Sequence, residues 1–337
     1  MRKIGVGVLA MIASVVPIAG AQSYTITDLG LLPGGTYSKP SAINDHGAVV
    51  GEADSSLGDR AFLWTASGGM QDIGTLPGDS QSLAYGINNL GAVVGESDGT
   101  GLHAFLWTSK NGMRDLGNLG GSTGAYATAI NNSGEVVGYS YIEGNSANHA
   151  YLWTDTAGMQ DLGTLGGNDS YAFAINDSGE IVGYSLLAGN PIPYRAFLWT
   201  QAGGMQNLGA LNESNRYSYA YGINASGQVV GYSGSGGDTT AFIWMQNGGM
   251  RSLGAGDASS ANGINAADEI VGTLLPGGNL SAFIWTPTQH LQYLSNLIPP
   301  NSGWTLTQAL AINRSGQIAV EGEINGAYHA ALLTPVN

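Results

Sequence analysis

The stretch from Ala127 to Gly163, ATAINNSGEVVGYSYIEGNSANHAYLWTDTAGMQDLG, contains four short apolar runs separated by turn residues. The runs are Ala127 to Ile130, Glu135 to Ser140, Ala150 to Thr154 and Met159 to Gly163. The same order recurs along the chain with a period of forty-odd residues. Four strand-like segments in a period of this length are typical of a β-propeller, in which each period supplies the strands of one blade.

An Ile-Asn pair marks each period, at spacings between 41 and 48 residues. The asparagines of these pairs are Asn44, Asn88, Asn131, Asn176, Asn224, Asn265 and Asn313. The sequence therefore predicts an all-β fold, a seven-bladed β-propeller with four antiparallel strands per blade, occupying residues 22–337 as a single domain of seven repeats.

The two ends of the chain complement each other. The seventh unit stops after its third run, Ala330 to Leu333, whereas Ile26 to Gly30 matches the fourth run and precedes the first Ile-Asn pair. We expect this N-terminal strand to close the C-terminal blade, because closure removes open sheet edges.

The turns and links predict where a ligand would bind. Asn131 to Gly134 and its sister copies are typical of tight hairpin turns, with Asp268 replacing the glycine in the sixth unit. Small residues in the first run suit the innermost strand, and the link Thr164 to Ser170 joins a fourth strand to the next first strand.

The links from second to third strand vary most, which predicts a binding face. They span residues 54–60, 97–102, 141–148, 186–194 and 234–240.

The N-terminus is typical of a secretory signal peptide. Arg2 and Lys3 precede an apolar run from Ile4 to Val16, and Ala19-Gly20-Ala21 is a small-residue cleavage site. A retained signal anchor is the alternative, but such a short run does not span a bilayer. We expect residues 1–21 to be removed near Ala21, leaving a secreted or periplasmic protein without membrane insertion.

Charge and composition exclude some partners. Without Arg2 and Lys3, 8 basic and 24 acidic side chains remain, a net charge of −16. Nucleic acids and anionic lipid surfaces are bound chiefly through Lys and Arg, so both are disfavoured. The chain has no cysteine and depends on its core rather than on disulfides. We expect a monomer that needs no cofactor.

The repeat resembles the HAF-repeat family of bacterial extracellular proteins, named for a His-Ala-Phe tripeptide. His103 to Trp107 carries the motif, His149 to Trp153 carries a close variant, and Asp161 to Gly167 is similar to the family's linker. Residues 297–304 and 329–335 look like its closing unit, so the resemblance covers residues 24–335. The departures are Arg60, Arg195, Thr240 and Ser281 at the histidine position and Ala331 at the phenylalanine position. The resemblance implies export and repetition, and no catalytic residue.

Individual reactive residues favour structural interpretations. His103, His149 and His329 share one repeat position, in units two, three and seven, so we do not expect the three to meet at one metal ion. The Asn-Asp-Ser-Gly turns lack the alternating Asp and terminal Glu of calcium loops. No Gly-x-Ser-x-Gly nucleophile elbow and no metalloprotease pattern stands out from the repeat, and single Ser, His and Asp residues are too common to identify a catalytic site. We therefore predict no catalytic residue and no metal site.

Two positions near the start of the first strand vary between units, whereas the alanines between them do not. Five residues before the asparagine stand Lys39, Leu83, Tyr126, Tyr171, Tyr219, Ser260 and Gln308, and three residues before it stand Ser41, Tyr85, Thr128, Phe173, Tyr221, Asn262 and Leu310. The candidate ligand-binding residues at the channel mouth are Tyr126, Tyr171, Tyr219, Asp169, Glu213 and Asp257. Aromatic faces beside carboxylates suit sugars or cationic groups, although tyrosines also fill gaps between blades.

The sequence favours a non-catalytic binding scaffold for a glycan, peptide or protein. The alternatives are a hydrolase or lyase acting on extracellular polysaccharide, and a structural component of the cell surface. An enzyme would bring two carboxylates, or a His and a Tyr, together with perturbed pKa values. A binding face would show aromatics and amides without such a pair, and a structural component would show no pocket.

Overall fold

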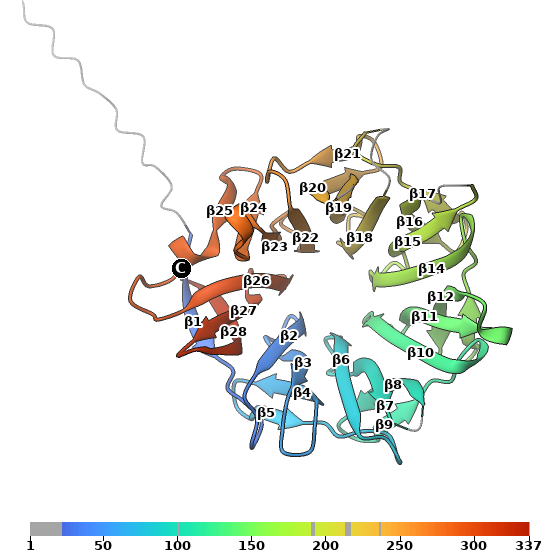
Figure 1. Ribbon diagram of the computed structural model, residues 1–337, viewed down its shortest axis with the longest axis horizontal. Helices are drawn as coiled ribbons and strands as arrows, with labels where there is room; N and C mark the ends of the chain where they lie inside the picture. The colour runs from blue at the N-terminus through green and yellow to red at the C-terminus, as the bar shows by residue number, and fades with distance from the viewer. Residues whose placement is uncertain (1–21, 100, 190–192, 213–216, 236, 337) are drawn as a thin grey trace, which may run out of the picture.

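The computed structural model describes residues 22–99, 101–189, 193–212, 217–235 and 237–336. Residues 1–21, which contain the expected signal peptide, lie outside these described residues. The described chain is built from short strands in successive antiparallel meanders arranged around a central channel (Figure 1). The fold is an all-β propeller. In the part of the chain that the structure describes, no helix is long and apolar enough to cross a membrane.

The innermost strands of the ring each end at the isoleucine of an Ile-Asn pair (Figure 1). These first strands are β2 (Ser38–Ile43), β6 (Gln81–Ile87), β10 (Gly120–Ile130), β14 (Gly166–Ile175), β18 (Tyr217–Ile223), β22 (Ser259–Ile264) and β26 (Thr305–Ile312). Small residues at alternate positions allow the strands to converge, as the sequence predicts. Ala84, Ala127, Ala172 and Ala220 are fully buried.

The second and third strands form the middle of each meander. The second strands are β3 (Val49–Ala53), β7 (Val93–Asp98), β11 (Val136–Ile142), β15 (Ile181–Leu187), β19 (Val229–Ser235), β23 (Ile270–Leu274) and β27 (Ile318–Ile324). The third strands are β4 (Arg60–Thr65), β8 (Leu102–Thr108), β12 (Asn148–Thr154), β16 (Tyr194–Thr200), β20 (Asp238–Met245), β24 (Ser281–Thr286) and β28 (Ala327–Val336).

The outermost strands are short and partly exposed. They are β5 (Gly69–Asp72), β9 (Gly112–Asp115), β13 (Gly158–Asp161), β17 (Gly204–Asn207), β21 (Gly249–Ser252), β25 (His290–Tyr293) and β1 (Ser23–Asp28). Three 3-10 turns lie in links, η1 (Glu143–Asn145), η2 (Pro276–Gly278) and η3 (Leu294–Asn296).

The sheets follow the chain order. Among the described residues there are five four-stranded sheets and one eight-stranded sheet, in which a single parallel pairing, Tyr194 with Tyr217, joins two consecutive meanders. Strand β1 pairs antiparallel with β28, from Ser23 opposite Val336 to Asp28 opposite Ala331. The pairing that the sequence predicts between the two ends of the chain is therefore present.

The core lies between neighbouring sheets. Val50 and Ala61 of one sheet pack with Ala84, Val93 and Phe105 of the next, and all five are fully buried. Burying a phenylalanine of this kind contributes roughly 1.5 to 3 kcal/mol. The tryptophans of the third strands also pack here, since each belongs to or packs against such a cluster; they are Trp64, Trp107, Trp153, Trp199, Trp244 and Trp285.

One expected link is wrong in part. Thr164 to Ser170 was expected to be a connection, but β14 already begins at Gly166, which pairs with Leu187. The second strand β15 continues to Leu187, opposite Gly166, and Gly167 approaches it closely. A Cβ at Gly167 would lie 2.7 Å from the Leu186 carbonyl oxygen.

The sixth turn carries local backbone strain. Asp268 adopts a φ of 61°, the left-handed region that glycine occupies in the other Asn-Gly turns. We expect Asp268→Gly to raise the free energy of unfolding by about 0.5 kcal/mol and Asp268→Ala to lower it by about 1 kcal/mol. Urea denaturation of both variants measures this difference. An alanine variant as stable as the glycine variant would contradict it.

Candidate functional site

The channel contains two cavities at different depths. One, of about 370 Å³, lies at the end formed by the tight turns and is lined by their Ile, Asn and following residues. The other, of about 660 Å³, is lined by residues nearer the start of the first strands. The second cavity is therefore the one closer to the variable links.

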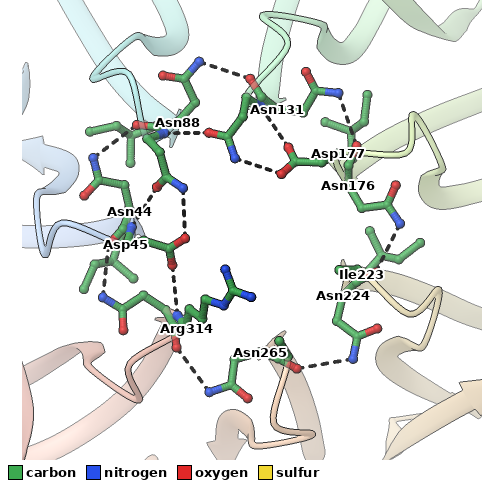
Figure 2. A pocket seen from close by; sticks show the side chains of 18 of the residues that line it. Asn44, Asp45, Asn88, Asn131, Asn176, Asp177, Ile223, Asn224, Asn265 and Arg314 are labelled. Atoms are coloured by element: carbon green, nitrogen blue, oxygen red, sulfur yellow. Dashed lines mark hydrogen bonds between the residues drawn. The ribbon is translucent and has the colours of Figure 1, made fainter.

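The asparagines form a hydrogen-bonded collar at the turn end (Figure 2). The Nδ2 atom of each donates to the backbone carbonyl of the next asparagine in the chain at 3.0 to 3.2 Å, and Asn313 donates back to Asn44. Each Oδ1 accepts two backbone N–H groups of its own turn, as Asn176 does from Ser178 and Glu180. Because both polar ends are engaged, the collar is a structural element.

A second ring of contacts lies inside the collar, nearer the middle of the opening (Figure 2). Asp45 accepts from the backbone N–H of Arg314, and Asp177 accepts from the N–H and side-chain amide of Asn132. The Arg314 side chain extends toward the middle of the opening (Figure 2). Two turns, at Ala225 and Ala266, contribute no polar side chain here. The ring is incomplete and adds less to the scaffold than the collar does.

The larger cavity has two unlike walls. One wall is largely aromatic and comes from consecutive sheets: Tyr85, Thr128, Tyr139, Phe173 and Tyr221. The opposite wall is largely polar: Ser260, Asn262, Thr273, Gln308, Lys39 and Ser41, with Pro40 and Leu310. Most of these side chains belong to the variable position three residues before the asparagine. The cavity thus offers flat apolar faces opposite hydroxyl and amide groups.

The three predicted tyrosines come together at the rim of this cavity. Each stacks on the tyrosine paired with it across the sheet: Tyr126 on Tyr139 with ring centres 4.5 Å apart, Tyr171 on Tyr184 at 4.7 Å, and Tyr219 on Tyr232 at 4.9 Å. Tyr139 also meets Tyr171 at 4.9 Å, and Tyr184 meets Tyr219 at 4.4 Å. These six rings form a continuous row over three consecutive meanders, which we call the tyrosine ladder.

The ladder rings are only partly buried, so some of their surface faces solvent. Burial raises the pKa of Tyr126 and Tyr171, which keeps both phenols neutral at ordinary pH. Of the six rings, Tyr139 lines the cavity itself. Tyr126, Tyr171 and Tyr219 stand two residues earlier on their strands than the cavity-lining side chains, toward the variable links.

The predicted acidic residues have different surroundings. Asp169 accepts a hydrogen bond from the Asn148 backbone at 2.9 Å, and the Asn148 side chain donates to the Tyr171 hydroxyl at 3.4 Å. The variable link before β12 thus joins Asp169 to the ladder. Asp257 is exposed in the link before β22. Glu213 lies outside the described residues.

Three carboxylates near the cavity were not predicted. Each is the fourth residue of a second strand: Glu52 and Glu96 come directly after Val-Val-Gly, and Glu321 comes after the equivalent Ile-Ala-Val. Burial raises the pKa of all three, that of Glu96 to about 7. Their shared repeat position, which holds tyrosine in the next three units, was the signal available in the sequence.

The motif histidines pair with aspartates. His149 Nδ1 lies 2.7 Å from Asp161 on the neighbouring strand, and His329 Nδ1 lies 3.0 Å from Asp28 of β1. His103 Nδ1 lies 3.1 Å from Asp79. These contacts join strands and links of the scaffold. Within the described ranges, no three His, Cys, Asp or Glu side chains are grouped so that they could hold a metal ion.

No protein-family model and no curated protein matches the sequence. The structure is similar to that of virginiamycin B lyase from Staphylococcus aureus, with 11% identity over 94% of this chain and 100% of that chain, and a TM-score of 0.56. The β-propeller domain of the Trilobed protease from Pyrococcus furiosus is similar with 8% identity over 89% and 93% of the two chains and a TM-score of 0.58.

TolB from Acinetobacter baumannii matches with 15% identity over 63% of this chain, with a TM-score of 0.44, and the match spans 52% of the TolB chain. The similarities to the lyase and to the Trilobed protease domain, both at low identity, concern the propeller fold alone.

Proposed function

We propose that this chain is an exported, non-catalytic β-propeller that binds a glycan, peptide or protein through its variable loop face. The observation that carries the proposal is the tyrosine ladder at the rim of a cavity of about 660 Å³. Binding sites of this size combine apolar walls with a few polar groups that orient the ligand. A purely structural component would have no use for such a cavity.

The proposed architecture is a closed ring of seven blades belonging to the HAF-repeat family. The collar supports it, because its hydrogen bonds pass through seven asparagines and return to Asn44. The pairing of β1 with β28 supports closure by the N-terminal strand. We propose that the protein is a secreted or periplasmic monomer, with residues 1–21 removed and without affinity for nucleic acid.

The first experiment is a glycan and peptide array probed with residues 22–337, followed by product analysis of every ligand found. Binding without turnover supports the scaffold. Replacing Tyr126, Tyr171 and Tyr219 together by leucine is expected to weaken binding of the ligand by roughly a hundredfold, because each aromatic contact contributes about 1 kcal/mol.

The matched control is Tyr293→Leu. Tyr293 is exposed on the outer strand β25, away from the channel, so its loss should leave the affinity unchanged. Circular dichroism and thermal unfolding show whether the triple variant remains folded. A folded triple variant with unchanged affinity would rule out the ladder as the binding site.

One observation favours the enzyme alternative, a hydrolase or lyase acting on extracellular polysaccharide. Burial, with a smaller contribution from the charge of Glu52, raises the pKa of Glu96 to about 7, and a carboxyl group with such a pKa suits general acid catalysis. Formation of shortened or unsaturated products from an array ligand, abolished in Glu96→Gln, would support the enzyme. Unchanged ligand after prolonged incubation supports the scaffold.

A further inference from the structure

One repeat position divides the channel mouth into two arcs. It is the second-strand position paired with the variable residue five before the asparagine, as Glu52 is with Lys39 and Tyr139 is with Tyr126. In chain order from the seventh unit it holds Glu321, Glu52, Glu96, Tyr139, Tyr184, Tyr232 and Thr273. Consecutive sheets contact each other, β27 with β2 and β3 with β6. Glu321, Glu52 and Glu96 therefore form one continuous carboxylate arc, facing the tyrosine ladder.

The carboxylate arc carries more negative charge than its surroundings balance. Lys39 lies between Glu52 and Glu321 and lowers the pKa of both, against the larger effect of burial. Gln308 donates a hydrogen bond to Glu321 at 2.6 Å. One cation among three carboxylates leaves the arc anionic once the glutamates are ionised.

Glu96 is the member of the arc with the least compensation. Its Oε2 atom is buried and has no hydrogen-bond partner among the described residues, while a hydrogen bond between the carboxyl group and Tyr85 lowers the pKa of Glu96 against the larger effect of burial. A buried carboxylate oxygen without a donor is costly, so a donor brought by a ligand would stabilise it. The titratable groups that face Glu96 from its own and adjoining strands supply no positive charge; they are Tyr85, Asp98, Glu52, Tyr126 and Tyr139.

The ladder side offers the complementary surface. Its stacked rings present partly exposed aromatic faces, on which both a sugar ring and an ammonium group are favourable. Ser260, Asn262 and Thr273 line the wall across the cavity. Ser260 Oγ donates to Asn262 Oδ1 at 2.9 Å and Asn262 Nδ2 donates to Thr273 Oγ1 at 3.3 Å. The remaining lone pairs of the two hydroxyls can accept hydrogen bonds from the hydroxyls of a sugar ring.

We propose that the ligand is a cationic oligosaccharide made of amino sugars with free amines. Its rings lie on the tyrosine ladder, its ammonium groups face the carboxylate arc, and its hydroxyls meet the polar wall of the cavity. This inference rests on the proposed binding function and names the ligand class. The net charge of −16 on residues 22–337 also favours approach of a polycation.

The test compares two ligands that differ only at nitrogen. Titration calorimetry with residues 22–337 uses the tetramer of β-1,4-linked glucosamine and its fully N-acetylated counterpart, with tetralysine as a third probe. The free-amine tetramer is expected to bind roughly tenfold or more tightly than the acetylated one and than tetralysine. Glu96→Gln and Glu52→Gln should each weaken its binding by roughly fivefold and leave weak binding of the acetylated tetramer unchanged.

Two controls separate binding from folding. Glu323→Gln, exposed on the same strand as Glu321, should not alter binding. Because burial raises the pKa of Glu96 above that of an unfolded chain, ionisation of Glu96 destabilises the fold as pH rises through about 7. Glu96→Gln should therefore unfold at a higher temperature than the parent at about pH 8 and at a similar one at about pH 5.

Each contrary result has its own meaning. Equal binding of both tetramers overturns the charge preference but leaves a glycan-binding function in place. Tetralysine binding as tightly as the amine tetramer overturns the sugar assignment. If neither tetramer binds and the array yields a different ligand, the inference alone fails; if the array yields none, the proposed function fails with it.

Discussion

Replacing Gly183 with alanine is expected to lower the free energy of unfolding by about 3 kcal/mol or more, enough to reduce soluble expression. Gly183 follows Ile181-Val182 on β15, and a Cβ there would lie 1.8 Å from the Tyr171 carbonyl oxygen and 2.9 Å from the Ala172 Cα. Both contacts are with backbone, which cannot rotate away. The strand β14 would have to move, and Tyr171 of the tyrosine ladder would move with it.

The close approach accompanies a bulge in the first strand. Residues of β14 and β15 change register between Ala172 and Ala174, and the same shift recurs in β6 and β18 next to Gly95 and Gly231. In the seventh unit Val320 stands at this position, where β26 has an additional shift between Leu306 and Gln308. The requirement for glycine thus follows from the local path of the first strand.

Gly101→Ala is the matched control for Gly183→Ala. Gly101 has a φ outside the left-handed region, and the nearest atom to a Cβ there belongs to the His103 ring, 3.5 Å away. Its substitution should change stability by no more than about 0.5 kcal/mol. Chemical denaturation of both variants measures the contrast, and equal stabilities would show that the strand relaxes around an added methyl group.

Replacing Asn176 with alanine is expected to cost about 3 kcal/mol of unfolding free energy. Asn176 is buried and donates to the Asn224 carbonyl and to Glu180, while its Oδ1 accepts from the N–H groups of Ser178 and Glu180. Alanine leaves several buried polar groups without partners, at roughly 1 to 3 kcal/mol each before relaxation and water entry. Circular dichroism during urea unfolding measures the loss.

Two further variants resolve which part of Asn176 matters. Asn176→Asp keeps an acceptor for the turn but places an oxygen beside the Asn224 carbonyl and the Glu180 carboxylate, so it should be nearly as destabilising at neutral pH. Asp177→Ala affects the second ring, where the sister turns already have Ala225 and Ala266, and should cost less than about 1 kcal/mol. If Asn176→Ala costs no more than Asp177→Ala, the collar does not stabilise the ring.

Much of the fold could be predicted because its signals are local. The residues from Asn131 to Gly134 predict the type of turn that they form. The period of the Val-Val and Leu-Trp runs predicts the order of strands within each unit. The match between Ile26 to Gly30 and the fourth runs predicted the pairing of β1 with β28, which the register from Ser23 to Asp28 confirms. Asp268 stands where the sister turns have glycine, and its φ of 61° preserves the left-handed conformation of the turn.

The candidate site was predicted less completely. Tyr126, Tyr171 and Tyr219 do come together, because equivalent positions of consecutive units lie side by side around the channel. The same reasoning applied to the second strands would have found Glu52, Glu96 and Glu321. The sequence does not reveal that these glutamates are buried or that they repel one another, because a strand pattern does not distinguish a buried glutamate from an exposed glutamate.

The repeat sequence by itself determines the order of strands, the turn types and the pairing of the chain's two ends. Hydrophobic period and turn chemistry act over a few residues and recur unchanged in each unit. The repeat sequence does not determine the contacts between units. The Asn44 to Asn88 hydrogen bond, the contact of Tyr139 with Tyr171 and the uncompensated Glu96 join residues from different sheets. Only the closeness of neighbouring sheets around the channel decides which of these side chains meet, how deeply they are buried and which charges remain for a ligand.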